Sequence, residues 1–512
     1  MLRKNLSILL FLILLGAFAV RLPGIFWGFK IDPKPHLIEY HIDEHRLAKH
    51  SRGIFRGASS AEWNYPVGYN VQVVLAATAL NPFREIDIPD FILIGRFLSL
   101  LYATLTVCLI FFLSKEIFRD HFVALFSGVL LALSGLHVTQ SHYATVDVSA
   151  TFWLYATIYS SLRYVRTNKI FYQCLAVLAA GTCLAFKLCV LAVIPIFYIL
   201  IKKRLKFIHW ALILGGLVIV FVAASGGRYT FGNLLLTIEN VHHDNLNVIL
   251  KNNKMWNPFI YFVELLPGLG LASFILLSSG IFFLRKKLSG KMFNNDLFFI
   301  LILPICSFGI LICCLDVPFP RHSLPLIPAL VMVAAYGLGE FNKKITHSWF
   351  LLILVSVILY QLVYVAAVEY YYVFDTRESA EQWIKRNIPR HQTIKLMGHF
   401  AIMPYLTEYK KSHDDPDLLV MHETSYFRYL RSEVCPFRQY PDLREVYHGR
   451  RAHLSSIQRI FKGESPFKLI KRFPVRYITP ESYLYKKIWG TYQFFIGDTL
   501  ILQSEKISMK AI

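Results

Sequence analysis

Residues 1–28 read MLRKNLSILLFLILLGAFAVRLPGIFWG, and this stretch decides the fold. Arg3 and Lys4 precede an apolar run of more than about 20 residues, the length that a helix needs to cross a bilayer. Similar apolar runs recur as far as Tyr370. Of the 512 residues, 55% are hydrophobic and only 17% are charged, whereas soluble proteins carry about 25% charged residues. The sequence therefore predicts a polytopic α-helical membrane protein.

The first run also contains Ala17-Phe18-Ala19, a small-x-small pattern typical of a signal-peptide cleavage site. Apolar sequence continues from there to Trp27. We therefore expect an uncleaved helix, with a cleaved signal peptide as the alternative. In both cases the loop that follows is expected to be extracytoplasmic.

The formal charge of +21 is concentrated in clusters between the apolar runs. Lys and Arg gather at the cytoplasmic ends of membrane helices, so the clusters orient the chain and make nucleic acid an unnecessary partner. The clusters are Arg3-Lys4, Lys115 with Arg119, Arg163 with Arg166 and Lys169, Lys202-Lys203-Arg204, Arg285-Lys286-Lys287 with Lys291, and Lys343-Lys344.

These clusters are consistent with about eleven spans, a cytoplasmic N-terminus and an extracytoplasmic C-terminus. We expect a transmembrane domain over residues 1–370, with a first extracytoplasmic loop at about 29–88, and a small extracytoplasmic α/β domain over 371–512. The expected spans are about 6–28, 91–113, one ending near 136, 148–163, 170–184, 188–201, 207–224, 260–284, 297–315, 324–340 and 348–370.

In the tail, Thr376 followed by ESAEQWIKR (378–386) predicts a capped helix with Trp383 and Ile384 facing inward. Residues 393–397, 477–479 and 499–502 predict strands.

With this topology, several polar side chains gather at the outer face. They are Asp43 and Glu44 in the first loop, His142 and Asp147 in the second, Lys187 at the outer end of a span, Arg96 near another, and Arg321 with His322 before the tenth span. Each has an ordinary interpretation as a solvated acid, a helix cap or a snorkelling base. One shared site explains most of them together.

A sugar carried on a polyprenyl phosphate matches this inventory. Its phosphate lies at headgroup level, and the leaving phosphate monoester has a second pKa of about 6, so it departs without a general acid. A single base to deprotonate the acceptor is then sufficient, and Lys or Arg stabilises the charge that develops on the phosphate.

Seven segments resemble landmarks of the GT-C membrane glycosyltransferases, most closely the protein O-mannosyltransferase and lipid A aminoarabinose transferase families. They are HIDE (41–44), WNYPVGY (63–69), GRFLS (95–99), HVTQSHYATVDV (137–148), FK (186–187), RHSLPLIP (321–328) and DTR (375–377). Two segments depart from the pattern: the typical Tyr-Pro-Pro is Tyr65-Pro66-Val67, and the typical Arg-Tyr is Arg321-His322.

The resemblance implies inverting transfer of a hexosyl or pentosyl group from a polyprenyl-phosphate sugar to an extracytoplasmic hydroxyl or phosphate of a lipid, glycan or protein. It implies that Asp43 or Glu44 is the base, with Asp147 as the acid of the second loop. Lys187 and Arg321 would then contact the donor phosphate, and we add Arg96, His142 and His322 as weaker candidates.

No ligand spacing supports a metal, so we expect no resident cofactor, although acids and histidines share the outer face. The expected partners are the lipid-linked sugar, an unknown acceptor and membrane lipids, and the expected location is a bacterial or archaeal plasma membrane. A transporter or lipid-linked sugar flippase is the main alternative, and a non-catalytic scaffold is a third.

Overall fold

The computed structural model describes residues 2–30, 36–37, 41–58, 66–187, 190–204, 206–227, 257–288, 298–313, 320–397, 403–412, 415–424, 426, 457–489 and 496–506. Residues 63–65 of the WNYPVGY landmark therefore lie outside the described residues. The chain divides into two compact units. The first comprises Met1–Ile25 with Arg46–Ala366, and the second Phe26–His45 with Ala367–Ile512.

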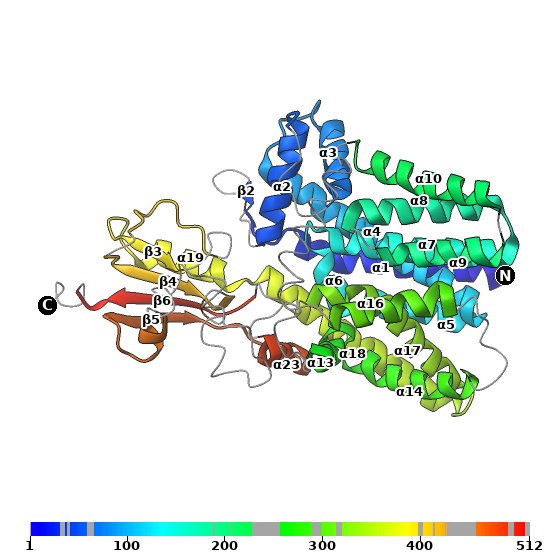
Figure 1. Ribbon diagram of the computed structural model, residues 1–512. Helices are drawn as coiled ribbons and strands as arrows, with labels where there is room; N and C mark the ends of the chain where they lie inside the picture. The colour runs from blue at the N-terminus through cyan, green and yellow to red at the C-terminus, as the bar shows by residue number, and fades with distance from the viewer. Residues whose placement is uncertain are drawn as a thin grey trace. The chain divides into compact units, whose positions relative to one another are not determined.

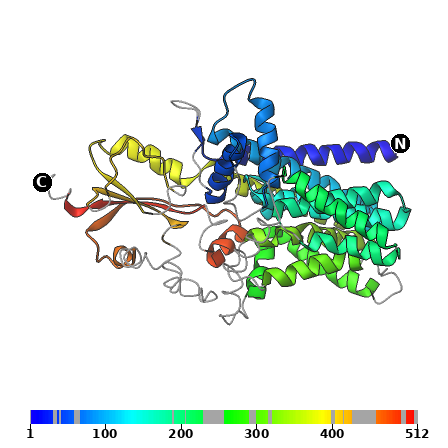
Figure 2. The ribbon, with the colours of Figure 1, turned by 45° about the horizontal axis from the view of Figure 1, so that its top comes forward.

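The first unit is helical, and its long helices run alongside one another (Figures 1 and 2). The helices that lie wholly or mainly in it are α1 (Leu2–Ile25), α2 (Ile42–Phe55), α3 (Gly68–Leu80), α4 (Ile88–Phe118), α5 (His121–Ala132), α6 (Gly135–Ser141), α7 (Val146–Thr167), α8 (Ile170–Lys187), α9 (Ile194–Lys202), α10 (Phe207–Ala224), α13 (Asn257–Leu269), α14 (Leu271–Leu288), α16 (Leu303–Cys313), α17 (Ile327–Asn342) and α18 (His347–Val373). The first residues of α2 and the last residues of α18 belong to the second unit. Three shorter turns join them: η1 (Val190–Val193), the π-helical η3 (Phe298–Ile302) and the 3-10 helix η4 (Pro320–Leu326).

The predicted spans overlap helices of the structure in the described residues, and α10 has the predicted bounds 207–224. Within the described residues, six helices are long and apolar enough to cross a membrane, or up to eight when each bent pair forms one span. The other predicted spans correspond to shorter or less apolar helices. The predicted fold class, a polytopic helical membrane protein with a small sheet region, is confirmed.

The predicted continuous span at 260–284 is instead a bent pair, in which α13 and α14 meet at 117°. Gly270 makes the bend with a φ of +89°, a conformation that residues with a Cβ rarely adopt. A second pair, α5 and α6, bends by 56°. The two bends meet, because Ser134 Oγ donates to the Gly268 carbonyl at 2.7 Å.

The predicted loop at 29–88 contains two helices, α2 and α3. Asn70 of α3 joins them, since its Nδ2 donates to the Leu47 carbonyl and to Ser51 Oγ, each at 3.1 Å. The described part of the predicted loop thus contains regular structure.

The second unit contains a four-stranded sheet in the order β3-β4-β6-β5. The strands are β3 (Ile394–Met397), β4 (Leu418–His422), β5 (Phe467–Phe473) and β6 (Thr499–Ser504), accompanied by helices α19 (Thr376–Asn387) and α23 (Pro480–Trp489). Only β3 and β4 pair in parallel. The strands predicted at 393–397 and 499–502 are confirmed, but 477–479 has no strand conformation.

Helix α19 covers one face of this sheet (Figure 1). Its Ala380 and Ile384 pack with Leu418, Val420 and Ile501. Asp375, rather than the predicted Thr376, caps the helix by accepting a hydrogen bond from the Arg377 backbone N–H.

Candidate functional site

A buried ion pair joins the first turn of α7 to the last turn of α8. Lys187 Nζ donates to Asp147 Oδ1. The Asp147 side chain is 5% exposed and the Lys187 side chain 28% exposed. The structure therefore brings together two residues that lie forty positions apart in the sequence, and it leaves part of the cation open to a ligand.

Arg321 and His322 of η4 lie within electrostatic range of the Asp147 carboxylate. Helix α13 supports η4: Tyr261 Oη lies 3.2 Å from His322 Nδ1, and Ser323 Oγ donates to Glu264 Oε1 at 3.3 Å. Lys187, Arg321 and Asp147 together carry a net charge of +1, and the Glu264 carboxylate lies beside Ser323 of η4.

Gly68, in the WNYPVGY landmark, allows α3 to approach the end of α8 closely. A Cβ at this position would lie 2.6 Å from the Ala185 carbonyl oxygen and 2.7 Å from the Phe186 ring. Both distances are shorter than real Cβ contacts. Gly68 thus sets how α3 packs beside the residue that precedes Lys187.

Tyr69 and Gly95 extend this packing to the second loop. Tyr69 Oη donates to the Gly95 carbonyl at 2.5 Å and lies 2.8 Å from Ser99 Oγ. A Cβ at Gly95 would lie 2.7 Å from Ala144 Cβ. The landmarks therefore form mutual packing contacts around the Asp147–Lys187 pair.

Arg96 and His142 are both buried, and both contact the C-terminal end of α1. Arg96 Nη1 donates to the Ile25 carbonyl at 2.8 Å, and the His142 ring fills the space beside Gly24. These contacts show how the two residues hold α1 against its neighbours. A direct contact with donor phosphate stays a prediction for both.

Asp43 and Glu44 lie in the first turn of α2, within the second unit. Glu44 is fully buried, so the ordinary interpretation as a solvated acid does not hold for it, while Asp43 is partly exposed. Glu44 shares the buried stripe of α2 with Leu47, Ala48 and Ser51, at the i, i+3, i+4, i+7 spacing of one helix face. Their convergence with Asp147, Lys187 and Arg321 stays a prediction.

Sequence reasoning missed Tyr261 and Glu264. Glu264 is an acid in a long apolar run and is fully buried, and such acids are functional candidates by default. An acid within an apolar run could have been recognised in the sequence, and in the structure Glu264 accepts a hydrogen bond from Ser323 of η4.

Among the described residues, no group of three or more His, Cys, Asp or Glu side chains could hold a metal ion. The cluster of Asp147, Lys187 and Arg321 can instead place two cationic side chains beside a phosphate group.

Comparison with known proteins connects this geometry to one fold. Residues 87–224 match the family described as dolichyl-phosphate-mannose-protein mannosyltransferase. An uncharacterized protein of Aquifex aeolicus is 25% identical over 281 residues, which is 52% of this chain. The chain spans about half the length of that curated relative, at 52%.

Two solved structures share the fold. The apo crystal structure of ArnT from Cupriavidus metallidurans has a TM-score of 0.51 and 13% identity, covering 85% of this chain and 96% of that chain. The archaeal oligosaccharyltransferase AglB from Archaeoglobus fulgidus, in complex with an inhibitory peptide and a dolichol-phosphate, has a TM-score of 0.51 and 11% identity, covering 81% and 61%. The expected resemblance is confirmed, and the chain has the fold of the GT-C membrane glycosyltransferases.

Proposed function

We propose that this chain, which has the GT-C fold, transfers a sugar from a polyprenyl-phosphate carrier to an extracytoplasmic acceptor hydroxyl or phosphate with inversion at the anomeric carbon. The observation that carries the proposal is the Asp147–Lys187 ion pair with Arg321 beside it. The dolichol-phosphate in the AglB complex supports a lipid-phosphate donor of the same class.

The net charge of the cluster explains how it would favour the reaction. A polyprenyl phosphodiester carries one negative charge, and the departing monoester gains a second because its second pKa is about 6. Lys187 and Arg321 would therefore attract the leaving group more strongly than the donor. Only interactions that strengthen toward the transition state accelerate the chemical step.

Asp43 is the proposed base because it is the more exposed acid of its pair. Its carboxylate accepts the proton of the acceptor, the acceptor oxygen bonds to the anomeric carbon, and the bond from that carbon to the phosphate oxygen breaks. The electron pair leaves with the polyprenyl phosphate. Glu44 and Asp147 would orient the base and the acceptor, and Arg96, His142 and His322 would support the phosphate side.

Purified protein in proteoliposomes with undecaprenyl-phosphate-linked hexoses and pentoses tests this assignment, with release of undecaprenyl phosphate as the readout. Asp43→Asn should lose transfer, while Glu85→Gln, an exposed acid of the same segment, should keep it. An Asp43→Asn protein with wild-type transfer would remove Asp43 as the base. Loss only in Glu44→Gln would move the role to its neighbour.

A transporter or flippase is the second candidate, because broken helices meeting inside a bundle are typical of transporters. The contact between Ser134 and Gly268 is such a meeting. Movement of a fluorescent lipid-linked sugar across the same proteoliposomes, with no transfer to any acceptor, would favour this alternative.

We also propose that the protein is multi-pass in a bacterial or archaeal plasma membrane, with the N-terminus cytoplasmic and the tail outside. No resident cofactor and no nucleic acid enter the proposal. Profiling lipid-linked sugars and envelope glycans in a deletion strain would identify the sugar and the acceptor.

A further inference from the structure

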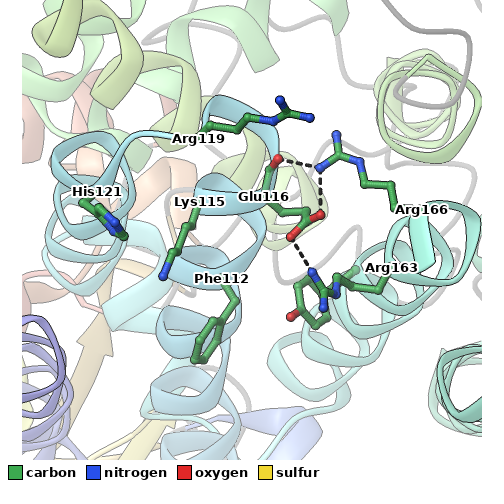
Figure 3. Close-up of a pocket in the computed structure, with 8 residues that line it drawn as sticks. Phe112, Lys115, Glu116, Arg119, His121, Arg163 and Arg166 are labelled. Atoms are coloured by element: carbon green, nitrogen blue, oxygen red, sulfur yellow. Dashed lines mark hydrogen bonds and ion pairs between the residues drawn. The ribbon is translucent and has the colours of Figure 1, made fainter. Parts of the chain in front are cut away.

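A charged cavity lies in the first unit, where α4 and α7 end and α5 begins. Its volume is about 480 Å³, within the range of about 300–1,000 Å³ for ligand sites. Figure 3 shows Glu116 of α4 facing Arg163 and Arg166 of α7, whereas the Lys115 side chain is directed to the other side, beside Phe112. The basic clusters predict that this end is cytoplasmic, so it is a different site from the Asp147 cluster.

Glu116 holds two of the cations in place. Its Oε2 accepts from Arg163 Nη1 at 2.9 Å and its Oε1 from Arg166 Nη1 at 2.8 Å. Arg166 also donates to the Glu116 carbonyl at 2.6 Å. The two guanidinium groups are therefore fixed before any ligand arrives, which lowers the entropic cost of binding.

The cavity keeps an excess of positive charge. Four cationic side chains and one carboxylate line it, so a charge of +3 remains when His121 is neutral. The described residues include no ion-pair partner for Lys115 or Arg119, and no dashed line reaches either in Figure 3. A ligand with more than one negative charge would complement this excess.

An apolar stripe leads to the cavity along α4. Leu101 and Leu105 are each 48% exposed, and Phe112, which lines the cavity, is 41% exposed. These positions share one helix face because they are spaced by about whole turns. A free phosphate has no apolar surface to bury against this stripe, whereas an acyl chain would bury its methylene groups along it.

We propose that this cavity binds the headgroup of a phospholipid with two phosphate groups, whose acyl chains lie along the exposed face of α4. Arg163 and Arg166 would contact one phosphate, with Arg119 on the same side of the cavity, and Lys115 on the other side would contact the second phosphate. Basic pockets between membrane helices bind headgroups of this kind on the cytoplasmic side.

The test compares wild-type protein with Lys115→Gln/Arg119→Gln in phosphatidylcholine nanodiscs that contain increasing tetraoleoyl cardiolipin, with bound lipid counted by native mass spectrometry. We expect about 30-fold weaker binding, at about fivefold per basic side chain lost. The control is Lys169→Gln/Lys206→Gln, which removes two exposed lysines outside the cavity and should bind as wild type.

Phe112→Ser separates a lipid from a soluble anion. It should weaken cardiolipin binding and leave inorganic phosphate binding unchanged, and millimolar inorganic phosphate should not displace the lipid. Unchanged binding in the cavity variant, an equal loss in the control, or displacement by inorganic phosphate would each overturn the proposal.

Discussion

Each end of helix α7 takes part in a cluster of two cations and one carboxylate, but the two clusters differ in burial. At its start, Asp147 is 5% exposed and faces Lys187 and Arg321. At its end, Arg163 and Arg166 face Glu116, which is 20% exposed. Each end places two cations around one carboxylate, so composition alone does not distinguish them.

Burial does distinguish them. A buried carboxylate depends on its partner, because removing one member leaves an uncompensated charge. A partly exposed pair exchanges its partner for water at little cost. The ion pair at the start of α7 should therefore matter for folding as well as for chemistry, whereas the ion pairs at its end should contribute little to stability.

The largest expected effect is that of Lys187→Met. Loss of the partner of buried Asp147 should lower the free energy of unfolding by about 3 kcal/mol, the lower part of the range for buried pairs, because the charge of Arg321 remains. Transfer should fall at least about 100-fold, as for removal of one transition-state donor. Thermal unfolding in detergent and the proteoliposome assay measure the two effects. Equal losses in Arg163→Met would erase the contrast between the two ends.

A second expected effect concerns the packing behind the start of α7. Gly68→Ala places a Cβ 2.6 Å from the Ala185 carbonyl and should cost about 1–3 kcal/mol, as overpacking does. Transfer should also fall, since α8 carries Lys187. The matched control is Gly215→Ala, where a Cβ meets nothing within 4 Å, and this change should be neutral or stabilising. A neutral Gly68→Ala would show that α3 does not constrain the site.

A third expected effect is a pH dependence of stability caused by the buried His422 of the second unit. Burial, followed by the charge of Arg377, holds the pKa of His422 well below its ordinary value of 6.5. The unfolded chain therefore binds a proton before the folded protein does. Below pH 6.5 the free energy of unfolding should decrease as the pH falls, by about 1.4 kcal/mol per unit, and above pH 6.5 this contribution is constant.

Hydrogen exchange of peptide 418–422 in the whole protein measures this dependence. His422→Asn should flatten the slope between pH 6.5 and 5. Parallel slopes in the two proteins would show that other groups control stability there.

The smallest expected effect is at the end of α7. Arg163→Met should cost about 0–1 kcal/mol, as exposed pairs do, because Arg166 still contacts Glu116. The difference should disappear in 1 M salt, where the Debye length is about 3 Å. The Lys187→Met difference should persist there. If the loss of stability in Arg163→Met persisted in 1 M salt, the ion pairs at the two ends of α7 would not differ in their exposure to solvent as proposed.

Hydropathy predicted the helical fold because apolar length is a local property of the chain. It missed the bend between α13 and α14, although Pro267 and Gly270 mark it in the sequence, because a window average ignores turn residues. It also missed α2 and α3, since neither is long enough to span a membrane. The helical spacing of Glu44, Leu47, Ala48 and Ser51 could have revealed α2.

The candidate site was predicted in part. Charges flanking the spans indicated that Asp147, Lys187 and Arg321 share one face, and the structure brings these three together. The contacts of Arg96 with Ile25 and of His142 with Gly24 depend on tertiary packing, which no local pattern encodes. Strand β4 was missed because its five residues are buried on both faces and show no alternation.

The length of helix α7 can be compared with the thickness of a membrane. At 1.5 Å per residue, Asp147 and Arg166 stand about 28 Å apart along its axis, close to the hydrocarbon thickness of about 30 Å. In a thicker bilayer one charged end would be drawn toward the acyl chains unless the helix stands upright, and in a thinner one the helix would tilt. If α7 crosses the bilayer as the sequence predicts, activity should depend on membrane thickness, and lipids of graded chain length would measure that dependence.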